Sequence, residues 1–162
     1  MDSGPVHELP SDFVVLEFAP TSSRDMWTYA TCCMSQPSDS TPIEIHLFSP
    51  VQCDSHVELL TAIAHYHRTG RALALGHTVN FGRPWLDGSG CEYGLISLPY
   101  LDGPDIEIVR LQQGGQIVKC LWLIPITESE RNYKKQFGLE SLEVKLDDAN
   151  LAYLDPYRRS AV

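Results

Sequence analysis

Histidines and acidic residues are the first side chains in this sequence that could do chemistry. His65 and His67 form an HxH pair, a spacing that can hold a metal ion when it lies on a strand. The pair falls in a segment with helical periodicity, where two residues correspond to a rotation of about 200°, so the two rings point apart. A metal site would instead need Glu44 and His46, which share a strand face, together with His67 or His77 from another segment. We therefore predict ordinary hydrogen-bonded histidines, with no metal and no cofactor.

Cys91 is the candidate thiol nucleophile. It follows Gly88-Ser89-Gly90, and His77 could serve as its base. No local signature supports this pair. Cys32 and Cys33 are neighbours on an expected strand, so their side chains should point to opposite faces. An odd total of five cysteines without a CxxC spacing indicates reduced thiols. We predict no catalytic residue, and a small metal- or thiol-dependent hydrolase is kept as an alternative.

Two loop segments carry residue types that are typical of protein interfaces. The segment GHTVNFGRPWL, residues 76–86, places an arginine before a proline and a tryptophan, and LPYLDGP, residues 98–104, is the second segment. The proline restricts its own backbone and keeps the preceding residue extended. Large aromatic side chains and arginine dominate interface energetics. Trp85 and Tyr100 could equally pack in the core or within loops. The candidate partner-binding residues in these segments are Phe81, Arg83, Trp85, Tyr100 and Asp102.

Helical periodicity and capping signals predict the helices that position these loops. Apolar residues recur at helical spacing between 57 and 67, which predicts a helix over residues 55–69. Ser55 and Glu58 would form its capping box, and Gly70 would supply a left-handed residue at its end. A second capping box, Thr127 to Glu130, opens a helix that runs toward Gly138. A further helical segment is expected over residues 139–146.

Alternating and β-branched segments predict the strands. Residues 43–48 alternate strictly, with three aliphatic side chains on one face and Glu44, His46 and Phe48 on the other, the pattern of a half-buried strand. Residues 117–124 are apolar on both faces and predict a buried central strand, preceded by a hairpin turn at Gly114-Gly115. Further strands are expected at residues 13–18, 27–34, 73–75, 77–80, 95–99 and 106–111. This distribution predicts an α+β fold, a mixed or largely antiparallel sheet packed against two or three helices.

Length and composition agree with a single domain. The chain has 162 residues, 43% of them apolar and 20% charged, with no internal repeat or linker. We expect a loose N-terminal arm at residues 1–12 and one domain at residues 13–162. The longest apolar runs are too short to span a bilayer, and Met1–Pro5 shows no secretory signal. A cytoplasmic protein is therefore expected.

The charge balance restricts the partners. Lysine and arginine number 12 and aspartate and glutamate 21, which gives a net charge of −9. Nucleic-acid binding and binding to anionic membranes both depend on clustered basic residues, which this chain lacks, so both are excluded. A basic protein partner would be attracted. The charge could equally serve solubility alone.

The order of these segments resembles the Suppressor of fused domain, most of all its stand-alone bacterial type. The segments that carry the resemblance are the strand starting at Trp27, PIEIHLFSP (42–50), HVELLTAIAHYHRTG (56–70), LGHTVNFGRPW (75–85), GLISLPYL (94–101), CLWLIPIT (120–127) and YLDP (153–156). The resemblance implies an α+β fold and protein binding without catalysis. It adds Tyr66, which matches the family's helix tyrosine, and His77 to the candidate partner-binding residues. His77 stands where the animal domain carries an acidic residue, which argues against the animal mode of peptide binding.

The resemblance also suggests a biological role. Bacterial members of this family are associated with polymorphic toxin systems as immunity proteins. We therefore predict a non-catalytic protein-binding module, an immunity-type inhibitor of a basic toxin domain, present as a monomer or weak dimer. A regulatory or scaffold domain that self-associates through an exposed strand edge is a further alternative.

Overall fold

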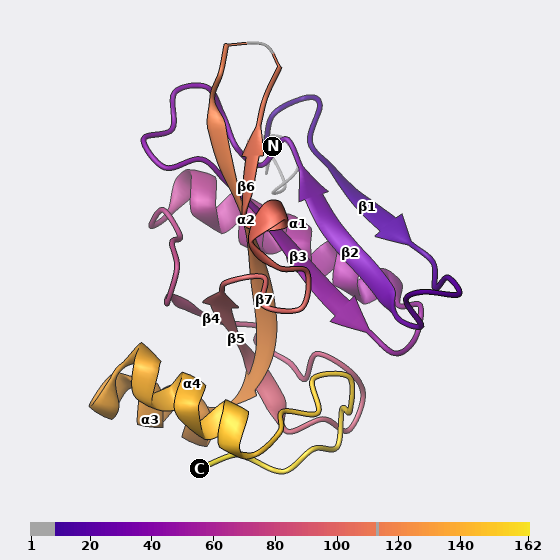
Figure 1. The fold of residues 1–162 in the computed structure, drawn as a ribbon, viewed down its shortest axis with the longest axis vertical. Coiled ribbons are helices and arrows are strands. Elements are labelled where there is room, and N and C mark those ends of the chain that lie inside the picture. The colour runs from indigo at the N-terminus through magenta and orange to yellow at the C-terminus, as the bar shows by residue number, and fades with distance from the viewer. Residues whose placement is uncertain (1–8, 113) are drawn as a thin grey trace, which may run out of the picture. The chain divides into compact units, whose positions relative to one another are not determined.

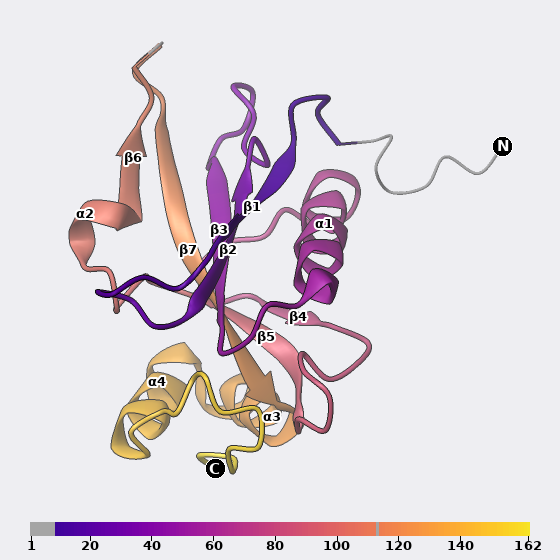
Figure 2. The same cartoon turned by 90° about the vertical axis from the view of Figure 1, so that its right-hand side faces the viewer.

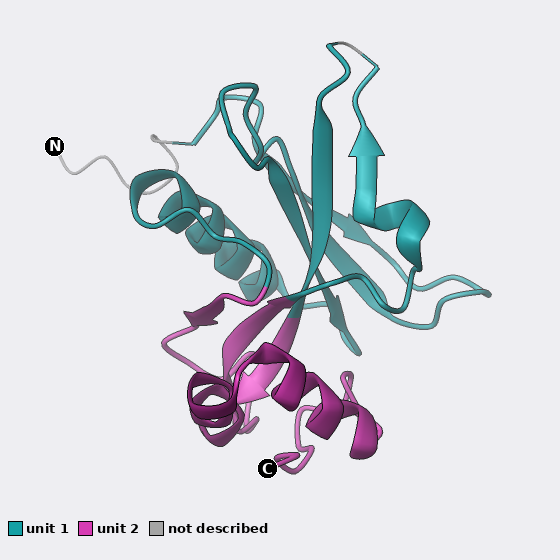
Figure 3. Ribbon diagram, turned by 60° about the vertical axis from the view of Figure 1, so that its left-hand side comes forward, with its two compact units in different colours: residues 1–75, 97–123 teal, residues 76–96, 124–162 magenta. Residues whose placement is uncertain are grey.

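The computed structural model describes residues 9–112 and 114–162. Over these residues the chain has an α+β fold with seven strands in a mixed, mostly antiparallel sheet, which confirms the predicted fold class (Figure 1). Three helices have ten residues or more, namely α1 (Asp54–Thr69), α3 (Glu128–Phe137) and α4 (Leu139–Asp148). The chain divides into two compact units: unit 1 holds the residues up to 75 and 97–123, and unit 2 holds residues 76–96 and 124–162 (Figure 3).

Unit 1 is built on an antiparallel meander that continues into a parallel pair. β1 (Val14–Phe18), β2 (Trp27–Cys32) and β3 (Ile43–Ser49) follow one another, and β3 then pairs in parallel with β7 (Ile117–Thr127). β6 (Ile108–Arg110) pairs antiparallel with β7. Gly114 and Gly115 both have positive φ, +86° and +64°, in the turn between β6 and β7, so the predicted hairpin is confirmed.

Helix α1 covers one face of this meander. It packs against β1 and β2, and Figure 2 shows it on one side of strands β1–β3 with α2 (Pro104–Glu107) on the other. Tyr29 on β2 is fully buried beneath the helix. Its hydroxyl accepts a hydrogen bond from the Cys53 amide at 2.7 Å, and its ring meets the His56 ring edge-on at 5.1 Å. The start of α1 is thereby fixed to the strand below it.

The ends of α1 differ from the sequence prediction. The helix is confirmed, but its N-cap is Cys53 and no side chain caps it there, so the predicted Ser55 capping box is wrong. Gly70 has φ −107° rather than a left-handed conformation. A Cβ atom at Gly70 would lie 2.9 Å from the Tyr66 ring. Glycine is needed at this position because the tyrosine ring lies over it.

β3 is buried on both faces, which corrects the prediction of a half-buried strand. Phe48 and His46 lie on the face away from Ile45, and both are buried. The Phe48 ring lies 5.2 Å from His46 and 5.6 Å from Trp122 on β7, at ring centroids. The prediction from alternating residues was wrong here because aromatic rings and a loop cover the face that was expected to be exposed to solvent.

Other strand predictions need smaller corrections. No strand forms at residues 73–75, and β5 spans Cys91–Ser97 rather than residues 95–99. Residues 106–111 divide between the single turn α2 and β6, because Pro104 favours the first position of a helix. β2 ends at Cys32, since Cys33 adopts φ +64°; the prediction that both cysteines continue a strand on opposite faces is wrong.

Unit 2 combines a short hairpin with the C-terminal helices. β4 (Thr78–Asn80) pairs antiparallel with β5, with Val79 opposite Gly94. α3 and α4 pack against each other and are joined at Gly138, which has φ +91°. The capping box at the start of α3 is confirmed: the Glu130 amide donates to the Thr127 hydroxyl at 3.2 Å, and the Thr127 amide donates to the Glu130 carboxylate at 2.8 Å.

The fully buried carboxylate of Glu130 also holds the C-terminal segment. The Arg158 guanidinium donates to both its oxygens at 2.7 Å, and the Ala161 amide donates to one of them at 2.9 Å. Burial alone would raise the pKa of Glu130, but the hydrogen bonds from Arg158 and from the Ala161 and Thr127 amides bring it below its ordinary value. This carboxylate is therefore charged and fully partnered at neutral pH.

The beginning of the chain is described only in part. Residues 1–8 of the predicted N-terminal arm lie outside the described residues, and Leu9 is buried. Among the residues that the structure describes, no helix is both long and apolar enough to cross a membrane.

We predict that Arg158→Ala lowers the free energy of unfolding by about 3–5 kcal/mol, because it leaves the buried Glu130 charge without its partner. Urea denaturation followed by circular dichroism measures this loss. The control is Arg159→Ala, whose exposed side chain should matter by no more than about 0.5 kcal/mol. Equal stability of the two variants would show that the pair does not hold the C-terminal segment.

Candidate protein-binding surface

The loop LPYLDGP, residues 98–104, has a defined backbone in unit 1. The Pro99 carbonyl accepts hydrogen bonds from the amides of Asp102 and Gly103 at 3.0 and 3.1 Å. Gly103 has φ +77°, a conformation that other residues rarely adopt, and Pro104 then opens the single turn α2. The loop thus reverses the chain in a few residues and leads through α2 into β6.

Asp102 fastens this loop to the sheet. Its side chain is 5% exposed, and it forms a short ion pair with the Arg24 guanidinium. The Arg24 guanidinium carbon also lies 5.3 Å above the Phe48 ring. Asp102 is one of the residues predicted to contact a partner; in the structure its carboxylate points inward, pairs with Arg24 and positions the loop.

His46 lies beneath the same ion pair. Its Nε2 atom is 3.9 Å from the Asp102 carboxylate, and no hydrogen bond satisfies that buried nitrogen. Burial lowers the pKa of His46 to about 4, with Asp102 opposing and Arg24 reinforcing this shift. The ring is therefore neutral at neutral pH, and Asp102 has Arg24 as its charged partner.

Around this inward anchor, large apolar side chains are exposed to solvent together with charged ones such as Asp105 and Arg110. Tyr100 is 59% exposed, and six further large apolar residues between positions 101 and 117 are 41–45% exposed. We call this set the β6 surface; its members are Tyr100, Leu101, Ile106, Ile108, Val109, Leu111 and Ile117. All belong to unit 1, on the loop, on α2 and on the β6–β7 hairpin. Ile108 and Val109 are consecutive on β6 and point to opposite faces, so the set covers both faces of the hairpin. Exposed apolar groups of this size often mark interaction sites.

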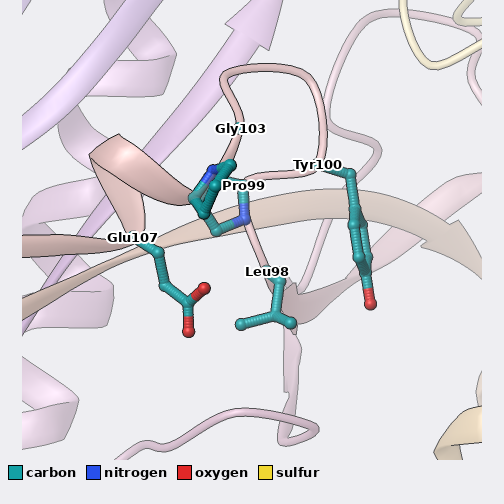
Figure 4. A pocket seen from close by; sticks show the side chains of 6 residues that line it. Leu98, Pro99, Tyr100, Gly103 and Glu107 are labelled. Atoms are coloured by element: carbon teal, nitrogen blue, oxygen red, sulfur yellow. The ribbon is translucent and has the colours of Figure 1, made fainter.

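A small pocket of about 270 Å³ lies at the start of this surface. It is lined by Leu98, Pro99, Tyr100, Gly103, Pro104 and Glu107. Figure 4 shows the Leu98 side chain and the Glu107 carboxylate facing the same hollow, with the Tyr100 ring standing beside it. The pocket offers apolar walls and one carboxylate, a combination that suits an apolar side chain next to a basic group.

The four predicted site residues of unit 2 have different environments. Trp85 is 3% exposed, and its amide donates to the Cys91 carbonyl at 3.0 Å, so it belongs to the core of this unit. Phe81 and His77 are half-buried, and Arg83 is exposed beside Gly82, which has φ +70°. Of these four, Arg83 is the one residue that is exposed.

The other three predicted site residues lie on two elements of unit 1, Tyr66 on α1 and Tyr100 and Asp102 on the loop 98–104. Tyr66 is 47% exposed. The prediction included Tyr100 but missed the aliphatic residues of β6. Their signal was present in the sequence, since residues 106–111 include four large aliphatic residues without strict alternation. A strand with one face in the core would have alternated.

The residues proposed for hydrolase chemistry serve structural purposes. The Glu44 carboxylate accepts hydrogen bonds from the Thr31 hydroxyl at 2.6 Å and the Ser35 hydroxyl at 2.7 Å. His67 Nδ1 accepts the Leu73 amide at 2.9 Å. Cys91 is buried, and burial raises the pKa of its thiol. Within residues 9–112 and 114–162, no group of three or more His, Cys, Asp and Glu side chains is placed to hold a metal ion.

We predict that Asp102→Asn loosens the loop at residues 98–104. A hydrogen bond to a charged group contributes about 1.5–3 kcal/mol, so the Asp102 and Gly103 amides should exchange with solvent roughly tenfold faster or more. Hydrogen–deuterium exchange read by NMR measures this change. Asp105→Asn alters an exposed carboxylate of the neighbouring turn and should leave both amides as they are. Unchanged exchange in Asp102→Asn would contradict the anchoring role.

We also predict that His46 makes the protein sensitive to acid. Its pKa in the folded state is below the ordinary value of about 6.5, so its contribution to stability is present above that value and is lost as the pH falls toward 4. Between pH 7 and pH 5 the loss amounts to about 2 kcal/mol, which His46→Gln should remove. Urea denaturation of both proteins at the two pH values measures the difference. A His46 ring that titrates near 6.5 by NMR would contradict this assignment.

Comparison with known proteins identifies the family of this chain. The family model described as Suppressor of fused protein (SUFU) matches residues 10–159. A crystal structure described as a SUFU homologue from Neisseria gonorrhoeae FA 1090 is similar with TM-score 0.83 and 35% identity, covering 97% of this chain and 81% of that one. A search of curated protein sequences finds no match.

Two more distant structures share the fold. The Sufu–Fu complex matches with TM-score 0.65 and 12% identity, over 92% of this chain and 76% of that one. Drosophila Suppressor of Fused matches with the same TM-score and identity over 92% of this chain and 42% of that one. The family model, which covers nearly the whole chain, and the structure at 35% identity agree: this chain belongs to the Suppressor of fused family.

Proposed function

We propose that this chain is a non-catalytic protein-binding module that recognises its partner through the β6 surface. The observation that carries the proposal is the exposure of that surface: seven large apolar side chains, each more than 40% exposed, lie within one segment of a family of protein-binding domains. The Sufu–Fu complex, which shares this fold, supports protein binding as the activity. The chemistry of Glu44, His46 and Cys91 supports no competing reaction, because each is buried or hydrogen-bonded within the fold.

The charge of the chain indicates the kind of partner. A net charge of −9 favours a basic protein, since long-range attraction raises the rate of encounter. Glu107 in the pocket and the exposed Asp105 beside it would meet lysine or arginine on the partner. The apolar walls of the pocket would take a neighbouring apolar side chain. The binding energy would come from the β6 surface and the orientation from these carboxylates.

We propose further that the partner is a toxin domain and that this chain is its immunity-type inhibitor. The support is the resemblance to the bacterial members associated with polymorphic toxin systems, together with the acidic charge. A basic toxin that acts on nucleic acid would present a surface complementary to this chain. Inhibition would follow from covering that surface, without any chemical step.

The experiment that tests the proposal is capture of the partner from host cells with the tagged chain, at low and high salt, followed by calorimetry with the purified partner. We expect one stoichiometric protein that is lost at high salt. Tyr100→Ser and Val109→Ser should each weaken binding about tenfold or more, which corresponds to ~1.4 kcal/mol for a side chain at the centre of an interface. If the partner is a toxin, co-expression of this chain should protect cells from it, and Tyr100→Ser should protect less.

Val144→Ser is the matched control, because Val144 is 52% exposed on α4 and lies outside the β6 surface. It should bind like the parent. Equal binding by all three variants would exclude the β6 surface as the site. A bait without a partner that forms dimers in light scattering would instead favour the scaffold alternative. The exposed alternate residues of the edge strand β1, Val14, Leu16 and Phe18, would then be the contact to test.

A further inference from the structure

The two adjacent cysteines at the end of β2 have an unusual geometry. Cys32 is the last residue of the strand, opposite Val14 on β1. Cys33 has φ +64°, which turns its side chain back toward its neighbour. The two Sγ atoms are consequently 3.8 Å apart, whereas consecutive side chains of a regular strand point to opposite faces.

The surrounding loop imposes this conformation. A left-handed backbone is unfavourable for a residue with a Cβ atom, and Cys33 and Asn150 are the described non-glycine residues that adopt it. After Cys33, the amides of Met34 and Ser35 donate to the Glu44 carboxylate at 3.2 and 3.0 Å. The Gln36 side-chain amide donates to the Cys33 carbonyl at 3.3 Å. The sulfur pair is therefore held by a hydrogen-bonded loop.

The pair is also reachable. Both cysteines are free and half-buried, in contrast to Cys91, which is buried. Burial and the neighbouring Cys32 and Asp12 side chains raise the pKa of Cys33 to about 12, so Cys33 remains a thiol at neutral pH. We take Cys32 as the sulfur that reacts first and Cys33, whose Sγ lies 3.8 Å from it, as the one that reacts second.

We propose that Cys32 and Cys33 form a dithiol modification site that reacts with small disulfides of the glutathione class and closes into a disulfide across one peptide bond. The Cys32 thiolate attacks one sulfur of the small disulfide, whose S–S bond breaks and releases one thiol. Cys33 then loses its proton and attacks Cys32 Sγ, and the second small thiol leaves. The small disulfide is reduced to two thiols, and the two cysteines are oxidised to one disulfide.

The closed form should be easily reduced. Neighbouring Cα atoms are about 3.8 Å apart, shorter than the roughly 4.4–6.8 Å that disulfides prefer. A strained disulfide favours its reduced form and reopens with excess thiol. The site would thus act reversibly, and it is independent of the proposed protein-binding function.

The test is incubation of the folded full-length chain with oxidised glutathione, followed by alkylation with N-ethylmaleimide and intact mass spectrometry. We expect the chain to lose two alkylation sites without gaining glutathione, to show the bond between residues 32 and 33 in peptide mapping, and to reopen with excess reduced glutathione. Cys33→Ser should keep glutathione bound to Cys32. Cys32→Ser should form no disulfide at this site.

Cys120→Ser is the matched control, because Cys120 is also half-buried and free, and this variant should close the pair like the parent. A second measurement needs no variant: phenylarsine oxide, which bridges two nearby thiols, should protect both cysteines of the parent from alkylation. A parent chain that keeps glutathione on Cys32, or whose Cys32 and Cys33 both stay open to alkylation after either reagent, would overturn the proposal.

Discussion

The ion pair between Asp102 and Arg24 is the interaction on which the candidate binding surface depends. The Asp102 carboxylate is almost fully buried, and no regular secondary structure holds the loop that carries it. Arg24 both neutralises this carboxylate and lies over the Phe48 ring, so the loop is fastened to the aromatic side of the sheet. Because Asp102 points inward, its neighbours Tyr100 and Leu101 are turned to solvent. A burial preference alone would have turned these apolar side chains inward.

Unit 2 uses the same physical solution for its C-terminal segment. There the buried carboxylate of Glu130 is shared by a helix cap and by Arg158. A buried charge is costly when it has no partners. The Glu130 carboxylate accepts four hydrogen bonds, and these can form together only when the chain around it adopts one arrangement. In each unit, an arginine–carboxylate pair therefore fixes an irregular segment that few apolar contacts could fix. The loops of this fold are positioned by charge, and its sheet and helices by apolar burial.

The sequence analysis predicted correctly those structures that depend on residues close together in the chain. Its predictions were wrong where contacts between distant segments determine the structure. Helix α1 was predicted from periodicity, and α3 from the four-residue capping signal Thr127–Glu130. Arg158 could not be recognised as the partner of Glu130, since 28 residues separate them. His46 was expected on the solvent-facing side of its strand, because the alternation of residues along a strand does not reveal that a distant loop covers that side. Trp85 and Tyr100 looked equivalent in the sequence, yet one is buried and the other exposed. The turn at Cys33 was not predicted because the strand was expected to continue past Cys32, where it ends.

The distribution of polar and apolar groups supports the binding function that we propose. An enzyme site needs ionisable groups that are partly free and matched to a proton transfer. Here Glu44 and Glu130 are occupied by hydrogen bonds, and His46 is held neutral under Asp102 and Arg24. What this chain exposes instead is the apolar β6 surface, flanked by carboxylates. Such a surface would weaken solubility unless a partner covers it or the net charge keeps copies of the chain apart. A charge of −9 would keep the copies apart, and it would also favour a basic protein as the partner that covers the surface. In the function we propose, the acidic composition and the exposed apolar strand are two parts of one arrangement: the charge would keep the free protein dispersed and direct it toward a basic partner.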